Sequence, residues 1–452
     1  MTGQHVRSHG VLMNGMSMPE ERHTIAHHLK EHGYNTALLG KAHFEPWLGS
    51  PVDFFENRMA SENSTGPHRG FDHMELANHF FEGHSHYDKY MDAYPEQKKA
   101  FYPMVTNKGQ NTAGKGATGA TQVWPMDIPR DIYHTDWVSQ RTKSWLGTQS
   151  SNKPWFCWMS FPDPHHPWDI PASELHRINW KDVPLPRLYS ENRSQLESWL
   201  NEKPAHWRGY FDGSLWTNLE SPREFVPADM TADQVREINA MTHIENELID
   251  EAVGDVIGFL HSKQWMKNTD IFFTTDHGEL QGDFGLLFKG PYHVDALMHL
   301  PFIWKPAETA NISPAEVASP VGHVDLASTF CAIAGISPPD YCEGKPLPTS
   351  EDEAVQQQRE IVLTQWDSEH GPIDMHLKSI YHRDGFLCTA YEKSHLYDGT
   401  EGELYDMKED PDQLRNLWSD PGYAVHRTEL TDRLYASLPD KTTEKLPRKA
   451  PV

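Results

Sequence analysis

The chain has 452 residues, of which 37% are hydrophobic and 11% aromatic, and its formal net charge is −25. This length suits one large α/β domain with a smaller one, and the composition excludes a disordered or collagen-like chain. So acidic a chain is a poor fit for broad binding to nucleic acid or to an anionic membrane, although a few local cations can still hold a small anion. No apolar stretch reaches the roughly 18 residues that a membrane span needs.

The four cysteines do not form a metal or redox motif. They are Cys157, Cys331, Cys342 and Cys388, and none belongs to a C-x-x-C pair, which argues against a zinc knuckle. Cys157 and Cys331 lie in apolar runs typical of buried small side chains. A disulfide between Cys342 and Cys388 is left open by the sequence.

The first predicted elements form half of a βαβ unit. A helix is expected after Pro19, with Ile25 and Leu29 on one face and Gly33 as its stop. The run Asn35–Gly40, NTALLG, then predicts a buried strand. Helix, short turn and strand in this order are typical of an α/β fold.

Predicted helices and strands continue to alternate farther along the chain. The expected elements are a helix at Asp136–Leu146, a strand at Pro154–Ser160, a helix from Thr231 to about His261, a strand at Ile271–Thr275 and a helix at Asp325–Ala334. A capping box, Thr231-x-x-Gln234, supports the start of the long helix. Residues from about 48 to 130 are predicted to be long loops, which usually carry specificity, and residues 170 to 228 form a second insertion rich in proline and tryptophan.

The pattern changes after about residue 340, where short strand-like runs follow one another without helices between them. These runs are Glu360–Thr364, Lys378–Tyr381 and Gly385–Tyr391, and they indicate a small antiparallel sheet. We therefore expect an α/β fold with a large mixed sheet flanked by helices on both faces. The core would span residues 1–340, and a C-terminal antiparallel-sheet subdomain with its tail would span 341–452.

Polar residues that follow the predicted strands are the best site candidates, because ligands of open α/β sheets bind beyond the carboxyl ends of the strands. Lys41 and His43 follow NTALLG and project the same way from an extended chain. Together they could hold an anion and move a proton. The alternative is a surface lysine beside a histidine that has a purely structural partner.

Three further candidates follow later strands or loops. His165 lies in P-H-H-P-W, where prolines fix the backbone around the imidazole, although a turn with exposed histidines is the alternative. Asp276 and His277 end a strand and could ligate a divalent cation, whereas the alternative for Asp276 is a helix N-cap. Lys289 follows a glycine-rich loop and could meet an anionic group, or it could be a solvated surface lysine.

The order of these segments resembles the type I sulfatases of the alkaline-phosphatase superfamily. The resemblance runs from Thr2 to about Asp410 and rests on TGQHVRSHGV, GKAHFEP, PHHPW, TTDHGELQGDFGLLFKG, LPFIW, HVDLASTFCAIAGI, EGKPL and ELYDMKEDPDQLRNL. It implies a metal-dependent hydrolase of sulfuric esters. The implied partner is a sulfated small molecule or carbohydrate, and the implied location is extracytoplasmic, whether periplasmic, secreted or lysosomal.

The resemblance also assigns roles to the candidate residues. Asp276 and His277 match metal ligands of the family. The second position is often Asn, so His277 is a tolerated variation, and it leaves Ca²⁺ versus Mg²⁺ open, with Ca²⁺ the more expected of these hard cations. Lys41 matches the lysine that contacts the nucleophile and sulfate, and His43 matches the histidine that takes a proton from the hydrated aldehyde. His165 would contact sulfate or the leaving oxygen, and Lys289 would contact the bridging oxygen.

The family nucleophile is a formylglycine made from the first residue of C/S-x-P-S-R-x-x-x-x-T-G. Thr2-Gly3 resembles the end of that motif, and none of the four cysteines lies in such a context. We therefore expect the formylglycine, and a first pair of aspartate ligands, upstream of Met1. The chain expressed alone is expected to have little or no activity and poor solubility, because a missing central strand leaves unpaired sheet edges.

Three alternatives remain open at this point. The first is a phosphonate or phosphate monoester hydrolase of the same superfamily. The second is an inactive sulfatase-like fragment or binding protein. The third is a carbohydrate-binding or scaffold protein, which the 15 tryptophans suggest only weakly, since protein cores also use tryptophan. The oligomeric state is not predicted.

Overall fold

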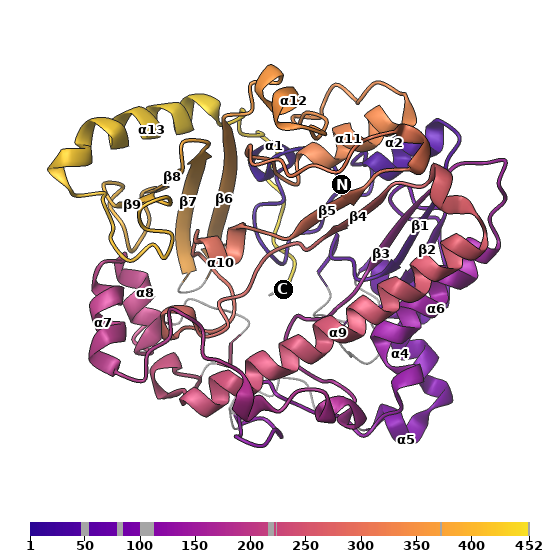
Figure 1. The fold of residues 1–452 in the computed structure, drawn as a ribbon, viewed down its shortest axis with the longest axis horizontal. Helices are drawn as coiled ribbons and strands as arrows, with labels where there is room; N and C mark the ends of the chain where they lie inside the picture. The colour runs from indigo at the N-terminus through magenta and orange to yellow at the C-terminus, as the bar shows by residue number, and fades with distance from the viewer. Residues whose placement is uncertain are drawn as a thin grey trace.

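The computed structural model describes residues 1–46, 54–78, 85–99, 113–215, 221–222, 224–370 and 373–450. Parts of the two long insertions predicted at about 48–130 and 170–228 therefore lie outside the described residues. Figure 1 shows helices packed around a parallel sheet on one side of the molecule and an antiparallel sheet under helix α13 (Ala424–Ser437) on the other. The predicted α/β class, with a C-terminal antiparallel sheet, is confirmed.

The parallel sheet contains three strands in the order β2-β1-β3. They are β1 (Asn35–Gly40), β2 (His73–Leu76) and β3 (Trp155–Ser160). Strand β1 is central, and after its first residue every side chain is buried. Gly40 ends it at a φ of 110°, where an added Cβ would lie 1.7 Å from the Ser160 carbonyl oxygen, so only glycine allows the two strands to close here.

Helices cover both faces of this sheet, as predicted. Alternate side chains of β1 point to opposite faces, so Ala37 and Leu39 pack with α6 (His134–Gly147) and α9 (Ala232–Ser262). Leu38 instead packs on the side of α2 (Ile25–Glu31) and α3 (Phe55–Ser61). The predicted capping box is present at the start of α9, where the Thr231 side chain accepts from the Gln234 backbone and Gln234 caps the Thr231 N–H in return.

Two further core strands form a separate antiparallel pair, β4 (Ile271–Thr274) and β5 (Phe302–Lys305). Phe156 of β3 and Phe272 of β4 both pack against Phe330 of α11 (Asp325–Ala334), with ring centroids 5.4 and 5.1 Å from it. Within the described residues no strand pairs with both β3 and β4. The core strands therefore lie in two sheets that share side-chain packing but no ladder.

The insertion predicted at 170–228 contains two helices, α7 (Arg193–Asn201) and α8 (Ala205–Phe211). Its prolines obscured them, yet Asn192 caps α7 and Pro204 immediately precedes α8. The remaining short helices are α1 (Val6–His9), α4 (His86–Tyr90), α5 (Pro95–Lys98), α10 (Asp295–Met298) and α12 (Glu351–Gln356). No described helix is both long and apolar enough to cross a membrane.

The C-terminal sheet is a four-stranded meander whose first two strands are longer than predicted and whose fourth strand was not predicted. Its strands, in order, are β6 (Ile361–His370), β7 (Ile373–His382), β8 (Phe386–Tyr391) and β9 (Gly402–Asp406). Ile380, Cys388 and Leu404 pack with Leu430 and Leu434 of α13 on one face. All four cysteines of the chain are free thiols, so the possible Cys342–Cys388 pair does not form.

Buried histidines join this sheet to the core. His206 of α8 contacts the Tyr397 hydroxyl through Nδ1 at 2.6 Å and the Pro291 carbonyl through Nε2 at 2.9 Å. His293 contacts the Ser379 hydroxyl on β7 at 2.5 Å. The domain boundary predicted at residue 340 stays a prediction, since these contacts tie the C-terminal sheet closely to earlier segments.

Acid should weaken this junction. Burial lowers the pKa of His206 to about 3, although the Pro291 carbonyl acts in the opposite direction, and burial followed by Lys378 lowers the pKa of His293 to about 3. Because both values lie below the ordinary value near 6.5, their contribution to stability is complete above pH 6.5 and is lost as pH falls toward 3. Each histidine should cost roughly 2 kcal/mol of unfolding free energy at pH 5.

Denaturant unfolding between pH 7.5 and pH 5 measures this loss. His206→Gln should reduce the pH-dependent part, whereas the exposed control His299→Gln should leave it unchanged. A wild-type unfolding free energy that is the same at both pH values would contradict the prediction.

The pair β4–β5 should promote self-association. Phe273 and Ile303 are direct cross-strand partners, and they are 40% and 62% exposed. Burying either side chain between two molecules gains about 1.5–3 kcal/mol at most, so Phe273→Thr with Ile303→Thr should weaken self-association roughly tenfold or more. Light scattering after size exclusion measures this, with Val425→Thr on α13, a position 73% exposed, as the matched control. Equal effects of the two changes would contradict a role for the strand pair.

Candidate active site at the ends of the core strands

Five of the six predicted site residues follow the carboxyl ends of core strands. Lys41 and His43 come directly after β1, His165 comes five residues after β3, and Asp276 and His277 follow β4. The sixth, Lys289, lies in the loop after the 3-10 turn Asp283–Gly285. This is the edge of an α/β core at which a ligand is expected to bind.

A direct ion pair joins the ends of β1 and β4. The Lys41 ammonium lies 3.0 Å from Oδ2 of Asp276. The backbone N–H of Lys41 donates to the Ser160 carbonyl of β3 at 3.0 Å. Desolvation within the site raises the pKa of Asp276, but Lys41, His277 and Lys289 outweigh it and hold that pKa well below its usual range. Asp276 is therefore ionised, and its side chain is still 57% exposed, so the carboxylate remains accessible to a further cation.

A second contact joins Lys289 to the loop after β3. The Lys289 ammonium lies 2.8 Å from Nε2 of His165, while Nδ1 of His165 contacts the carbonyl of His166. An ammonium can only donate and a carbonyl can only accept, so His165 is the neutral tautomer with its proton on Nδ1. One N–H of Lys289 is used in this contact, and Oε2 of Glu279 lies 4.0 Å from the same ammonium.

His277 connects the two contacts. Its ring centroid lies 6.2 Å from that of His165, and its Nε2 lies 3.7 Å from Oδ2 of Asp276. Desolvation, followed by the nearby Lys289, lowers the pKa of His277 to about 4, so the ring is neutral near pH 7. Its Nδ1–H donates to the Gly278 carbonyl at 2.8 Å, which leaves Nε2 as an acceptor.

These two residues fit a cation as half of a binding site. A metal-binding histidine commonly donates its second N–H to a backbone carbonyl, as His277 does to Gly278, and a neighbouring carboxylate adds a hard oxygen ligand. Within the described residues, Asp276 and His277 have no third histidine, cysteine or carboxylate close enough to complete a site. The pair therefore offers two ligands, and other groups must supply the rest.

His43 is the remaining predicted site residue. Its side chain is exposed two residues beyond Lys41, and its part in proton transfer stays a prediction. A residue that sequence reasoning missed is His323, just before α11. Burial and the amino group of Met1 lower the pKa of His323, whereas the Thr275 backbone and Asp276 raise it, so the ring lies near Asp276 and the start of the chain. Its place in the segment HVDLAS is the feature of the sequence that could have identified it.

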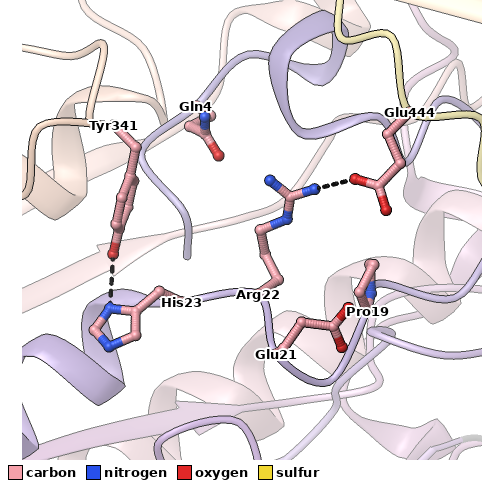
Figure 2. A pocket seen from close by; sticks show the side chains of 7 residues that line it. All are labelled: Gln4, Pro19, Glu21, Arg22, His23, Tyr341 and Glu444. Carbon is pink, nitrogen blue, oxygen red and sulfur yellow. Dashed lines mark hydrogen bonds and ion pairs between the residues drawn. The ribbon is translucent and has the colours of Figure 1, made fainter.

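A separate hollow of about 360 Å³ lies between the N-terminal segment and the end of the chain. Figure 2 shows its lining side chains, among which Arg22 pairs with Glu444 at 2.9 Å and His23 contacts the Tyr341 hydroxyl at 3.2 Å. None of the six predicted site residues lines it. Because its arginine is already paired with a carboxylate, we assign the hollow no catalytic role.

Comparison with known proteins identifies the family. The family model "Sulfatase" matches residues 1–336, and the model "N-sulphoglucosamine sulphohydrolase, C-terminal" matches residues 282–439. The Uncharacterized sulfatase YidJ of Escherichia coli (strain K12) is 24% identical over 441 residues, which is 96% of this chain and 75% of that protein. The Delta 4,5-hexuronate-2-O-sulfatase of Bacteroides thetaiotaomicron is 26% identical over 250 residues, 51% of this chain and 50% of that protein.

A solved structure has the same fold. The phosphonate monoester hydrolase of Agrobacterium radiobacter superposes with a TM-score of 0.74 at 20% identity, covering 96% of this chain and 84% of that one. At this identity the likeness concerns the fold alone, whereas the first family model matches well over half of the chain. The chain is therefore a member of the type I sulfatase family of the alkaline-phosphatase superfamily.

Proposed function

We propose that this chain carries the active site of a metal-dependent sulfatase that hydrolyses a sulfate ester, with a carbohydrate as the leaving group. The observation that carries the proposal is the convergence of Lys41 on Asp276 and of Lys289 on His165 at one edge of the core. A divalent cation, Ca²⁺ before Mg²⁺, is proposed to bind Asp276 and His277. The nucleophile is proposed to be a formylglycine that precedes Met1.

The lysines supply the positive charge that this chemistry needs. When a sulfuryl group leaves its alcohol, negative charge grows on the departing oxygen, and fixed cations stabilise that charge more in the transition state than in the ground state. The Lys289 ammonium, which contacts His165 at 2.8 Å, is proposed to donate to the bridging oxygen when a substrate is bound. A cation held by Asp276 and His277 would polarise a sulfate oxygen when bound.

The first residue of the chain lies near the candidate site. The amino group of Met1 lies close to His323, and His323 in turn lies beside Thr275 and Asp276. Met1 also accepts the Ile25 N–H at 2.9 Å, which fixes it beside α2. Any residues that precede Met1 would therefore enter the site region from this side.

The substrate class rests on relatives. A relative that matches half of this chain is a hexuronate-2-O-sulfatase, which supports a sulfated sugar. The alternative activity, on phosphonate or phosphate monoesters, is consistent with the fold shared with the phosphonate monoester hydrolase. The inactive alternative is less favoured, because both lysines and both metal-type ligands are present and in contact. An extracytoplasmic location stays a prediction by analogy.

The first test compares substrates. The chain as given should hydrolyse 4-nitrophenyl sulfate little or not at all, whereas a version extended upstream through C/S-x-P-S-R should hydrolyse it faster than phenyl phosphonate. A preference for phenyl phosphonate would favour the alternative hydrolase. Equal turnover by the two versions would refute the upstream nucleophile.

The second test removes the charges. In the extended protein, Lys41→Ala and Lys289→Ala should each lower kcat by about 10²–10³, because one fixed donor to the transition state is lost. Lys305→Ala, which removes an exposed lysine at the end of β5, is the matched control and should leave kcat unchanged. A loss smaller than threefold in both site variants would contradict the proposed pocket.

A further inference from the structure

Four ionisable side chains meet in the dry interior between α6, α9 and the loop after β3. His134 belongs to α6, Asp163 and Asp169 to the loop, and Glu245 to α9, and none is more than 5% exposed. Nε2 of His134 lies 3.3 Å from Oδ1 of Asp169 and 3.6 Å from Oδ1 of Asp163. We call these four residues the interior cluster.

Hydroxyl groups contact only some of the carboxylate oxygens of the interior cluster. The Tyr133 hydroxyl lies 2.9 Å from Oδ2 of Asp163 and 3.2 Å from Oδ1 of Asp169, and the Thr135 hydroxyl donates to Oδ2 of Asp163 at 2.6 Å. Oδ1 of Asp163 and Oδ2 of Asp169 find no hydrogen-bond partner among the described residues. Buried carboxylate oxygens are rarely left in this state.

Glu245 adds an independent observation. Its side chain is fully buried, and the backbone of Asp169 acts as a hydrogen-bond donor to its carboxyl group. Burial, then the charges of Asp163 and Asp169, raise the pKa of Glu245 well above its usual range, which places its carboxyl group within electrostatic reach of both. Three buried carboxyl groups thus lie near one imidazole, and without a cation a carboxyl group in such a place holds a proton instead of a charge.

We propose that His134, Asp163 and Asp169 bind a divalent transition-metal cation such as Zn²⁺ or Mn²⁺, with the Glu245 carboxyl group supplying further negative charge beside it, at a site separate from Asp276 and His277. One ligand atom from each of the first three residues lies within 4.8 Å of the others, which is the spacing around a shared ion. One imidazole nitrogen among carboxylate oxygens favours Zn²⁺ or Mn²⁺ over a purely hard cation.

The expected role of this cation is structural. It would fasten α6 and α9 to the loop after β3, and Asp163 lies two residues before His165, which contacts Lys289. The cluster itself is closed to solvent, so a substrate cannot reach the ion. This inference does not rest on the proposed sulfatase activity, and its test does not measure activity.

The test is the metal content of the purified full chain after exchange into metal-free buffer, measured by elemental mass spectrometry. We expect about one equivalent of Zn²⁺ or Mn²⁺ in the wild type. Asp276→Asn should retain it, whereas Glu245→Gln and Asp169→Asn should each lose it. Glu237→Gln is the matched control, because it makes the same change at a buried position of α9 where the carboxylate already binds the Thr118 side chain and backbone.

A strong chelator should lower the thermal unfolding midpoint of the wild type and of Glu237→Gln by about 5 °C or more, and added Zn²⁺ or Mn²⁺ should restore it. Glu245→Gln should show no such shift. If Glu245→Gln does not fold, the proposal is tested by the metal content of Asp169→Asn and by the effect of the chelator on the unfolding midpoint of the wild type. No bound cation in the wild type after incubation with either metal would overturn the proposal, as would equal retention by Glu245→Gln, which indicates an adventitious ion only.

Discussion

The ion pair between Lys41 and Asp276 is the contact on which the rest of the site depends. These residues are 235 positions apart in sequence and follow strands of two sheets that share no backbone ladder, yet their side chains meet at 3.0 Å. The pair keeps Asp276 ionised and brings the ends of β1 and β4 together.

The second contact, between Lys289 and His165, completes the charge balance. The ring of His165 stands 6.2 Å from that of His277, so the two contacts belong to one site rather than to two. Each ammonium group also has a carboxylate neighbour, because Oδ2 of Asp276 lies 3.0 Å from Lys41 and Oε2 of Glu279 lies 4.0 Å from Lys289, in a chain whose net charge is −25. A small anion can still be attracted by the two ammonium groups at contact distance, whatever the field of the whole molecule.

Much of the fold could be predicted from the sequence, and each success or failure has a physical reason. The strand Asn35–Gly40 appeared with the predicted bounds because it is buried along nearly its whole length, and the start of α9 followed from its capping box. The helices α7 and α8 were missed because prolines and tryptophans dominate their segment. The strands β6 and β7 are longer than predicted because polar and apolar residues alternate in them, so only part of each has the appearance of a buried strand.

The sequence indicated candidate site residues but not the contacts between them. Strand-end positions identified Lys41, His165 and Asp276, yet nothing local could show that Lys41 contacts Asp276 or that Lys289 contacts His165. The interior cluster could not be predicted from the sequence, because its members come from two helices and a loop. The first and last of them are more than 100 residues apart, and their spacing is irregular. Only the packing of α6 on α9 brings them together.

The central claim is that both lysines face a single anion. Diffraction from a crystal of this chain soaked with selenate, which has the shape and charge of sulfate, tests it through the anomalous signal of selenium. The account predicts one selenate within hydrogen-bond distance of Nζ of both Lys41 and Lys289. Selenate bound elsewhere, or bound to one lysine while the other points away, would contradict it.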